Sequence, residues 1–93
     1  MLYMVIEAFK GGNGVAVYRR FAEKGRMLPE GLLYRGSWVT ADGERCFQLM
    51  ECEDEALLEQ WMAGWRDLVE FEVTPVVSSQ QMAALHGDSQ PPG

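Results

Sequence analysis

The chain has 93 residues, a formal net charge of −6 and a sequence pI near 4.6, which argues against non-specific binding to nucleic acid or to an anionic membrane surface. Hydrophobic residues make up 47% of it, enough for a small core and too many for a disordered chain. At this length we expect one domain of low intrinsic stability, over residues 1–86, followed by a flexible tail over residues 87–93. No segment resembles a membrane span or a signal peptide, so we expect a cytoplasmic protein.

The first element is predicted to be a central strand. Leu2–Phe9 is almost continuously apolar, as is typical of a strand buried on both faces. A glycine-rich exit, Lys10–Gly14, leads to a helix predicted near 14–25, with Asn13 as its N-cap and Gly25 ending it in a left-handed conformation. The spacing of these glycines matches neither dinucleotide-binding nor P-loop patterns, so it does not predict a phosphate site.

The middle of the chain predicts a β-hairpin. Two strands, near 32–40 and 45–52, flank Asp42–Gly43, which is typical of a two-residue type I′ turn. Such a turn sets the register of the two strands. It places Trp38 opposite Phe47, Ser37 opposite Gln48, Arg35 opposite Met50, and Tyr34 opposite Glu51.

A second helix and a last strand follow. Acidic residues 53–55 favour a helix start, because the helix macrodipole attracts negative charge. Leu57, Trp61 and Trp65 then recur at helical spacing, which predicts a helix near 54–66. Residues 69–77 alternate apolar and polar, and Pro75 places this strand at an edge of the sheet. Ser78–Gln81 has the spacing of a capping box and predicts a short terminal helix.

The order of the elements predicts the topology. Strand, helix, strand, strand, helix, strand forms two split βαβ units with right-handed crossovers. We therefore predict an α+β ferredoxin-like βαββαβ sandwich, whose antiparallel sheet has the order 4-1-3-2 and carries both helices on one face.

Hydrophobicity divides the predicted sheet into two faces. We expect the more apolar set to face the helices with Phe21, Trp61 and Trp65, because burying it gains more free energy. That set is Tyr3, Val5, Phe9, Tyr34, Trp38, Phe47, Leu49, Phe71 and Val73. The other set, expected to form a subunit interface, is Met4, Ile6, Arg35, Ser37, Cys46, Gln48, Met50, Glu72 and Thr74.

The residues that usually hold metals are sparse. Cys46 and Cys52 lie six residues apart on one predicted strand, too far to bond to each other, and we expect two reduced, buried thiols. The single histidine, His86, lies near the tail. We therefore expect no metal site, no cofactor and no Cys–His catalytic pair.

Four stretches carry a resemblance to a known family. MLYMVIEAFK, GRMLPEGLLYRGSWV, RCFQLMECED and DLVEFEVTPVV together resemble domain-of-unknown-function family 3303, small bacterial proteins, across about residues 1–80. The resemblance implies a ferredoxin-like subunit of the dimeric α/β-barrel group, in which two sheets face each other, but it implies no activity. Related dimeric barrels include cofactor-independent monooxygenases and isomerases, which rely on histidine or on a Trp–Asn–Arg set that the predicted sheet lacks.

Two functions compete on this basis. The first is a non-catalytic homodimer that binds a small molecule or simply assembles. The face proposed for ligand binding or dimerisation comprises Met4, Arg35, Ser37, Gln48, Met50 and Glu72. The alternative is a cofactor-independent monooxygenase or isomerase acting between the sheets, with Glu7 or Glu51 as base if burial raises the carboxyl pKa. Arg35, Trp38 and Gln48 would assist it, although no catalytic residue is identified.

Two further expectations concern partners. RNA binding is disfavoured, because the third strand, RCFQLMEC, lacks the stacking aromatics and glycine that RNA-recognition motifs of this topology use. The first half of the chain carries most of the basic residues and the second half most of the acidic ones. We therefore expect Arg35 of one subunit to meet Glu72 of the other across a two-fold axis.

Overall fold

The computed structural model describes residues 1–12 and 14–87. Its elements, in order, are β1 (Leu2–Phe9), a 3₁₀ turn (Lys10–Gly12), α1 (Gly14–Lys24), β2 (Leu33–Val39), β3 (Arg45–Glu51), α2 (Ala56–Ala63), β4 (Val69–Val76) and α3 (Ser79–Leu85). The predicted N-cap, Asn13, lies outside the described residues, as does most of the predicted tail.

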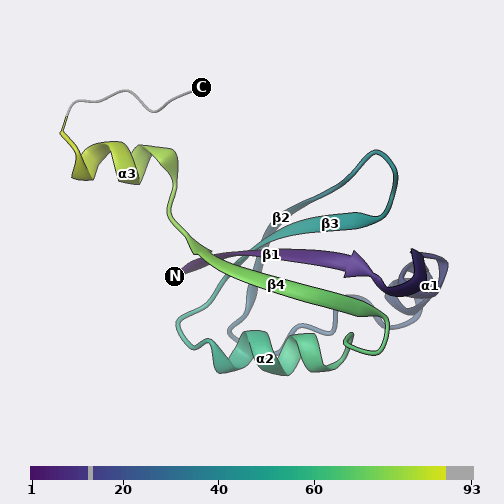
Figure 1. The fold of residues 1–93 in the computed structure, drawn as a ribbon. Helices are drawn as coiled ribbons and strands as arrows, with labels where there is room; N and C mark the ends of the chain where they lie inside the picture. The colour runs from purple at the N-terminus through teal and green to yellow at the C-terminus, as the bar shows by residue number, and fades with distance from the viewer. Residues whose placement is uncertain (13, 88–93) are drawn as a thin grey trace.

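The four strands form one antiparallel sheet in the order β2-β3-β1-β4. This order is the predicted 4-1-3-2 arrangement, so the ferredoxin-like α+β fold is confirmed. Figure 1 shows α1 and α2 on one side of the sheet and α3 beyond the end of β4, away from both. One face of the sheet is therefore covered by helices, and the other is left open.

The hairpin register agrees with the prediction near the turn and departs from it farther away. Trp38 lies opposite Phe47 and Ser37 opposite Gln48, as predicted. A bulge between Tyr34 and Gly36 then shifts the pairing by one residue, so Tyr34 lies opposite Met50. The turn itself is also longer than predicted: Gly43 has a φ of 76° and donates its N–H to the carbonyl oxygen of Thr40, 2.8 Å away.

The helix boundaries have local causes. Gly25, with a φ of 66°, ends α1 as predicted. The helix α2 is shorter than predicted, because the amides of Gly64 and Trp65 bond to carbonyls three residues back, which tightens the last turn. The predicted capping box of α3 is present, since Ser78 and Gln81 each accept a hydrogen bond from the other's backbone N–H.

The core lies between the helices and the covered face of the sheet. Along β1, alternate residues Tyr3, Val5, Glu7 and Phe9 are buried. Leu58, Trp61 and Met62 of α2 are buried with them, as is Trp65 just after it.

The predicted division of the sheet is right for β1 and β4 and wrong for β3. On β3, Cys46, Gln48 and Met50 are buried, whereas Phe47 and Leu49 are half-buried on the other side. The cause is the β1–β3 register, which pairs odd residues of β1 with even residues of β3, for example Val5 with Gln48. Directly paired residues share a face, so a polar side chain enters the core. By the same rule Ser37 lies on the covered face and Trp38 on the open one, so the prediction is also wrong for these two residues of β2.

The open face is consequently apolar at its centre. It consists of Leu2, Met4, Ile6 and Ala8 of β1, Arg45, Phe47, Leu49 and Glu51 of β3, Leu33 and Trp38 of β2, and Glu70, Glu72, Thr74 and Val76 of β4. Trp38, at its edge, is 59% exposed. No helix in the described part of the chain is both long and apolar enough to cross a bilayer.

Candidate functional site

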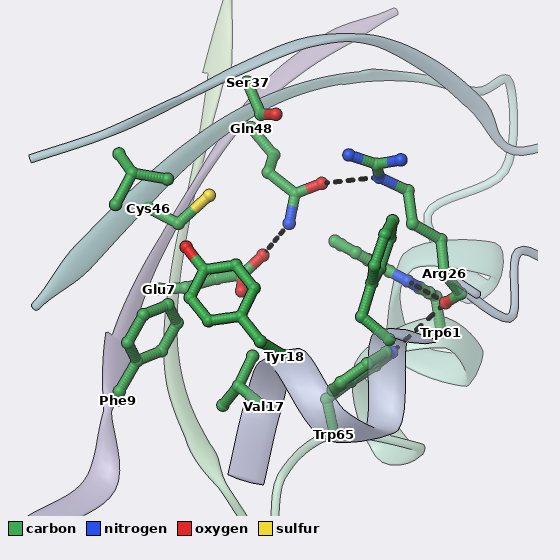
Figure 2. Close-up of a pocket in the computed structure, with 12 residues that line it drawn as sticks. Glu7, Phe9, Val17, Tyr18, Arg26, Ser37, Cys46, Gln48, Trp61 and Trp65 are labelled. Carbon is green, nitrogen blue, oxygen red and sulfur yellow. Dashed lines mark hydrogen bonds between the residues drawn. The ribbon is translucent and has the colours of Figure 1, made fainter. Parts of the chain in front are cut away.

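A cavity of about 180 Å³ lies between the covered face of the sheet and the two helices (Figure 2). Its apolar walls are formed by Phe9, Val17, Phe21, Val39, Trp61 and Trp65. Its polar lining comes from Glu7, Tyr18, Arg26, Ser37, Cys46 and Gln48. Cavities that bind small molecules have this character, mostly apolar with a few convergent polar groups.

Glu7 is the buried acid of this cavity. It lies in the middle of β1, where the alternation of the strand points it toward the helices, and it is only 6% exposed. Burial raises the pKa of its carboxyl group to about 7, although the hydrogen bond from Gln48 and the charge of Arg26 act in the opposite direction. Glu7 can therefore exchange a proton near neutral pH.

Gln48 connects Glu7 to a cation. Its side-chain amide donates a hydrogen bond to Glu7 Oε2, and its own Oε1 accepts one from Arg26 Nε at 3.4 Å (Figure 2). The adjacent pairing of Val5 with Gln48 and of Glu7 with Cys46 brings these side chains together. Every buried side-chain polar atom of the described residues has a partner, which offsets the cost of burying the two polar side chains.

Arg26 lies in the connection between α1 and β2 and is held at two places. Its guanidinium carbon lies 3.6 Å from the ring centre of Tyr34 and 5.0 Å from that of Phe21. Its carbonyl oxygen accepts hydrogen bonds from the indole nitrogens of both Trp61, at 3.0 Å, and Trp65, at 3.1 Å.

The backbone around Arg26 is strained. The following residue, Met27, is the one described non-glycine residue with a positive φ, 59°. Such a conformation costs about 1–3 kcal/mol and persists only where its surroundings hold it in place. The two indole hydrogen bonds to the carbonyl oxygen of Arg26 provide that support, so buried tryptophans of the core fix the backbone position of Arg26.

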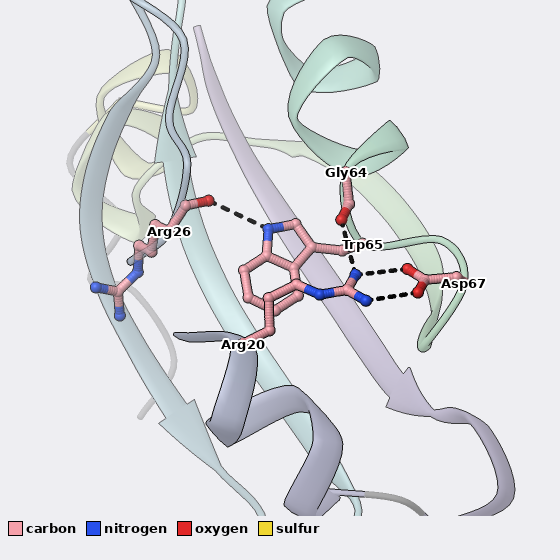
Figure 3. Close-up of polar contacts among 5 residues, drawn as sticks. All are labelled: Arg20, Arg26, Gly64, Trp65 and Asp67. Atoms are coloured by element: carbon pink, nitrogen blue, oxygen red, sulfur yellow. Dashed lines mark hydrogen bonds and ion pairs between the residues drawn. The ribbon is translucent and has the colours of Figure 1, made fainter. Parts of the chain in front are cut away.

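A second arginine fastens α1 to the segment after α2. Arg20 forms a two-pronged ion pair with Asp67, with both N···O distances at 2.6 Å, and donates to the carbonyl of Gly64 at 3.1 Å (Figure 3). Its guanidinium also lies 5.7 Å from the ring centre of Trp65. This contact joins the basic first half of the chain to the acidic second half.

The cysteines offer no reactive thiolate. Cys46 and Cys52 are both buried and unbonded. Burial, and to a lesser degree the charge of Glu7, raises the pKa of the Cys46 thiol to about 11, and burial also raises that of Cys52. A thiol is a poor nucleophile when its pKa is raised. In the described part of the chain, no group of three or more His, Cys, Asp or Glu side chains is placed to hold a metal ion.

The six residues predicted for a binding or dimer face do not share one face. Ser37 and Gln48 line the cavity, and Met50 is fully buried on the same side of the sheet. Met4 and Glu72 lie on the open face. Arg35 lies at the bulge of β2 and forms an ion pair at 2.6 Å with Glu51 of its own chain.

The residues named for the catalytic alternative are also divided between the two faces of the sheet. Glu7 and Gln48 meet in the cavity, whereas Trp38 and Glu51 lie on the open side with Arg35 as the partner of Glu51. Sequence reasoning did not identify Arg26 as a residue of the site. Its neighbours Gly25 and Pro29 signal a turn, but no local pattern indicates that this turn returns a guanidinium to the cavity.

A comparison with family models gives one result. The family described as "Domain of unknown function (DUF3303)" matches residues 1–90 of the chain. No curated protein and no solved structure gives a significant match.

Proposed function

Since the chain belongs to the DUF3303 family, whose description names no activity, we propose its function from the site: a homodimer that binds a small, mainly apolar ligand in the cavity of each subunit. The observation that carries this proposal is the hydrogen-bonded pair of Glu7 and Gln48, buried at the wall of an otherwise apolar cavity. An apolar pair would stabilise the core more simply, since replacing buried polar or ionic groups by apolar residues is often neutral or stabilising.

Thermal denaturation with a library of metabolites tests ligand binding. A ligand at 100 times its Kd adds about 2.7 kcal/mol to the free energy of unfolding, which is readily seen in a domain of this size. Val39→Trp should abolish the shift, because Val39 lines the cavity and is 46% exposed, so a larger side chain can block the opening without disturbing the core. Val77→Trp is the matched control, at 44% exposure and away from the cavity.

The homodimer part of the proposal rests on the open face. A second copy suits this face, because acidic and basic side chains lie toward opposite edges. Glu70 and Glu72 are on β4, at one edge, whereas Arg45 of β3 and Arg35, at the bulge of β2, lie toward the other edge, where Glu51 is paired with Arg35. When two copies stack with β2 over β4, apolar centres meet and opposite charges approach twice.

Sedimentation velocity tests this assembly. Wild type should sediment as a dimer, and Leu49→Glu should sediment as a monomer because it places a charge at the centre of the open face. Val15→Glu, on α1 and 70% exposed, is the control and should remain dimeric. Monomeric wild type at concentrations of tens of micromolar contradicts this part of the proposal and leaves ligand binding to be judged separately.

A second candidate function is proton transfer. The raised pKa of Glu7, about 7, is the observation that favours it. In an isomerase, Glu7 would take a proton from one carbon of the substrate and return it to another, with no net gain or loss of electrons. A bound ligand that exchanges a carbon-bound hydrogen for deuterium in D₂O with wild type, but not with Glu7→Gln, would favour this candidate over binding alone.

A further inference from the structure

Arg26 is a half-buried cation that contacts no carboxylate directly. Among residues 1–12 and 14–87 it makes no ion pair, whereas Arg20, Arg35 and Arg66 are each paired at 2.6 Å. Its contact with Gln48, at 3.4 Å, is longer than a usual N–H···O hydrogen bond of 2.7–3.2 Å. Its two terminal nitrogens have no hydrogen-bond partner among the described residues, so they are available to an anion.

This guanidinium is prepared for binding before a ligand arrives. The rings of Tyr34 and Phe21 contact the guanidinium, and the two indole hydrogen bonds fix the backbone that carries it. Little side-chain entropy is therefore left to lose when an anion is bound. The planar fork of an arginine matches a carboxylate, with two parallel N–H···O bonds.

The cavity sets the size and character of the rest of the ligand. Its volume of about 180 Å³ is close to that of a cavity of about 150 Å³ that accepts benzene, so it suits one six-membered ring. Phe21, Trp61 and Trp65 supply aromatic walls beside Arg26. From these observations, and on the proposed function of ligand binding, we infer that the cavity takes a small aromatic monocarboxylate whose carboxylate binds Arg26.

The charge of the ligand is limited to one. Among the described residues, Arg26 is the one cationic side chain that lines the cavity. Glu7 also lines the cavity, and Gln48 bonds to both Arg26 and Glu7. A second negative charge on the ligand would have no partner and would lie near the acid. A phosphate monoester, which carries close to two charges at neutral pH, is therefore a poorer match than a carboxylate.

Three probes of one size test the inference: benzoate, benzyl alcohol and benzylamine, measured by calorimetry at fixed salt. Benzoate should bind wild type at least about ten times more tightly than benzyl alcohol, as a charge-assisted hydrogen-bond pair predicts. Arg26→Gln should remove that preference and leave the binding of benzyl alcohol nearly unchanged. Arg26→Lys keeps the charge but not the fork, and should retain only part of the preference. Because the indoles bond to the backbone of Arg26, near-ultraviolet circular dichroism should show both variants folded.

The outcomes separate the two proposals. If benzyl alcohol or benzylamine binds as tightly as benzoate, or Arg26→Gln keeps the preference, the carboxylate inference is wrong and ligand binding stands. If no probe binds and the metabolite library also gives no thermal shift, both are wrong. If no probe binds but the library yields a ligand without a carboxylate, only the aromatic monocarboxylate is excluded.

Discussion

The two faces of the sheet each depart from the usual distribution of side chains. The covered face, although mainly apolar, also buries an acid and an amide, Glu7 and Gln48, whereas the open face presents Ile6, Phe47 and Leu49 under no element of the described residues. A sequence selected only for monomer stability would exchange these positions, because apolar burial is the main source of stability. Each face therefore carries side chains that the stability of the monomer alone does not explain, and the proposed ligand binding and dimerisation would give both a role.

The largest expected difference in stability between the two faces is at two tryptophans, Trp61 and Trp38. Trp61→Ala should cost about 3–5 kcal/mol in the free energy of unfolding, because Trp61 is 3% exposed and its removal leaves a cavity. Trp38→Ala should cost less than about 1 kcal/mol in the monomer, because Trp38 is 59% exposed on the open face. Urea denaturation at low protein concentration measures both. Similar losses for the two variants would contradict the assignment of faces.

The pH dependence of stability sharpens the contrast at Glu7. Its carboxyl pKa is raised from an ordinary value of 4.5 to about 7 in the folded state. Between these values the unfolded chain loses the proton while the folded chain keeps it, so the free energy of unfolding falls as pH rises from 4.5 to 7. The contribution of Glu7 is constant above that range. The fall amounts to roughly 3 kcal/mol.

Glu7→Gln should remove this fall, because the amide has no proton to lose in this range. Tyr18, Arg26 and Cys46 are the other ionisable groups of the cavity, and the substitution leaves all three in place. Glu72→Gln, on the open face, is the control and should keep the wild-type pH profile. Urea denaturation at several pH values measures the difference, and parallel profiles for wild type and Glu7→Gln would contradict the burial of a titrating acid.

Charge exchange at the edges of the open face is expected to have a smaller effect. Arg35→Glu or Glu72→Arg alone should shift the protein toward monomer, and the double exchange should recover dimer. Because Arg35 also bonds Glu51 within its own chain, Arg35→Glu should be the more disruptive of the two. Sedimentation velocity distinguishes the variants, and single exchanges that dimerise as well as wild type would remove this pair from the interface.

The smallest effect is expected at the Arg20–Asp67 pair, on the covered side. Asp67→Asn should lower the melting temperature only slightly, and high salt should reduce the difference, because surface ion pairs are weak and screened. Glu59→Gln, which removes the exposed partner of Arg66, provides a comparison of the same kind without an aromatic contact. A melting temperature that falls equally at low and high salt would indicate that Asp67 acts by packing.

The fold could be predicted from the sequence because its signals are local. Alternation, the Asp42–Gly43 turn, the acids before α2 and the capping box of α3 each act over a few residues. Which side chains of β3 face the helices could not be predicted. The strands β1 and β3 are joined through α1 and β2, so no turn sets their register. A shift of one residue exchanges every side chain between faces, and hydrophobicity favoured Phe47 and Leu49 over Cys46, Gln48 and Met50.

The cavity within one subunit was not predicted, although some of its residues were named from the sequence. Gln48 was chosen as a binding residue and Glu7 as a candidate base, but they were separated by the wrong register and met only when β1 and β3 were paired. Arg26 depends on contacts far along the chain, with Gln48, Trp61 and Trp65. Such contacts leave no periodic pattern around Arg26 itself.

The placement of the three tryptophans gives the molecule two optical signals of different origin. Trp61 and Trp65 are buried with their indole nitrogens bonded to one carbonyl oxygen, whereas Trp38 stands in solvent on the opposite face. Acrylamide, which quenches only accessible indoles, should therefore extinguish the Trp38 emission first and leave a blue-shifted remainder. A ligand in the cavity would change the emission of Trp61 and Trp65, whereas contact between two subunits would protect Trp38 from the quencher. The two events could therefore be followed separately in unlabelled protein.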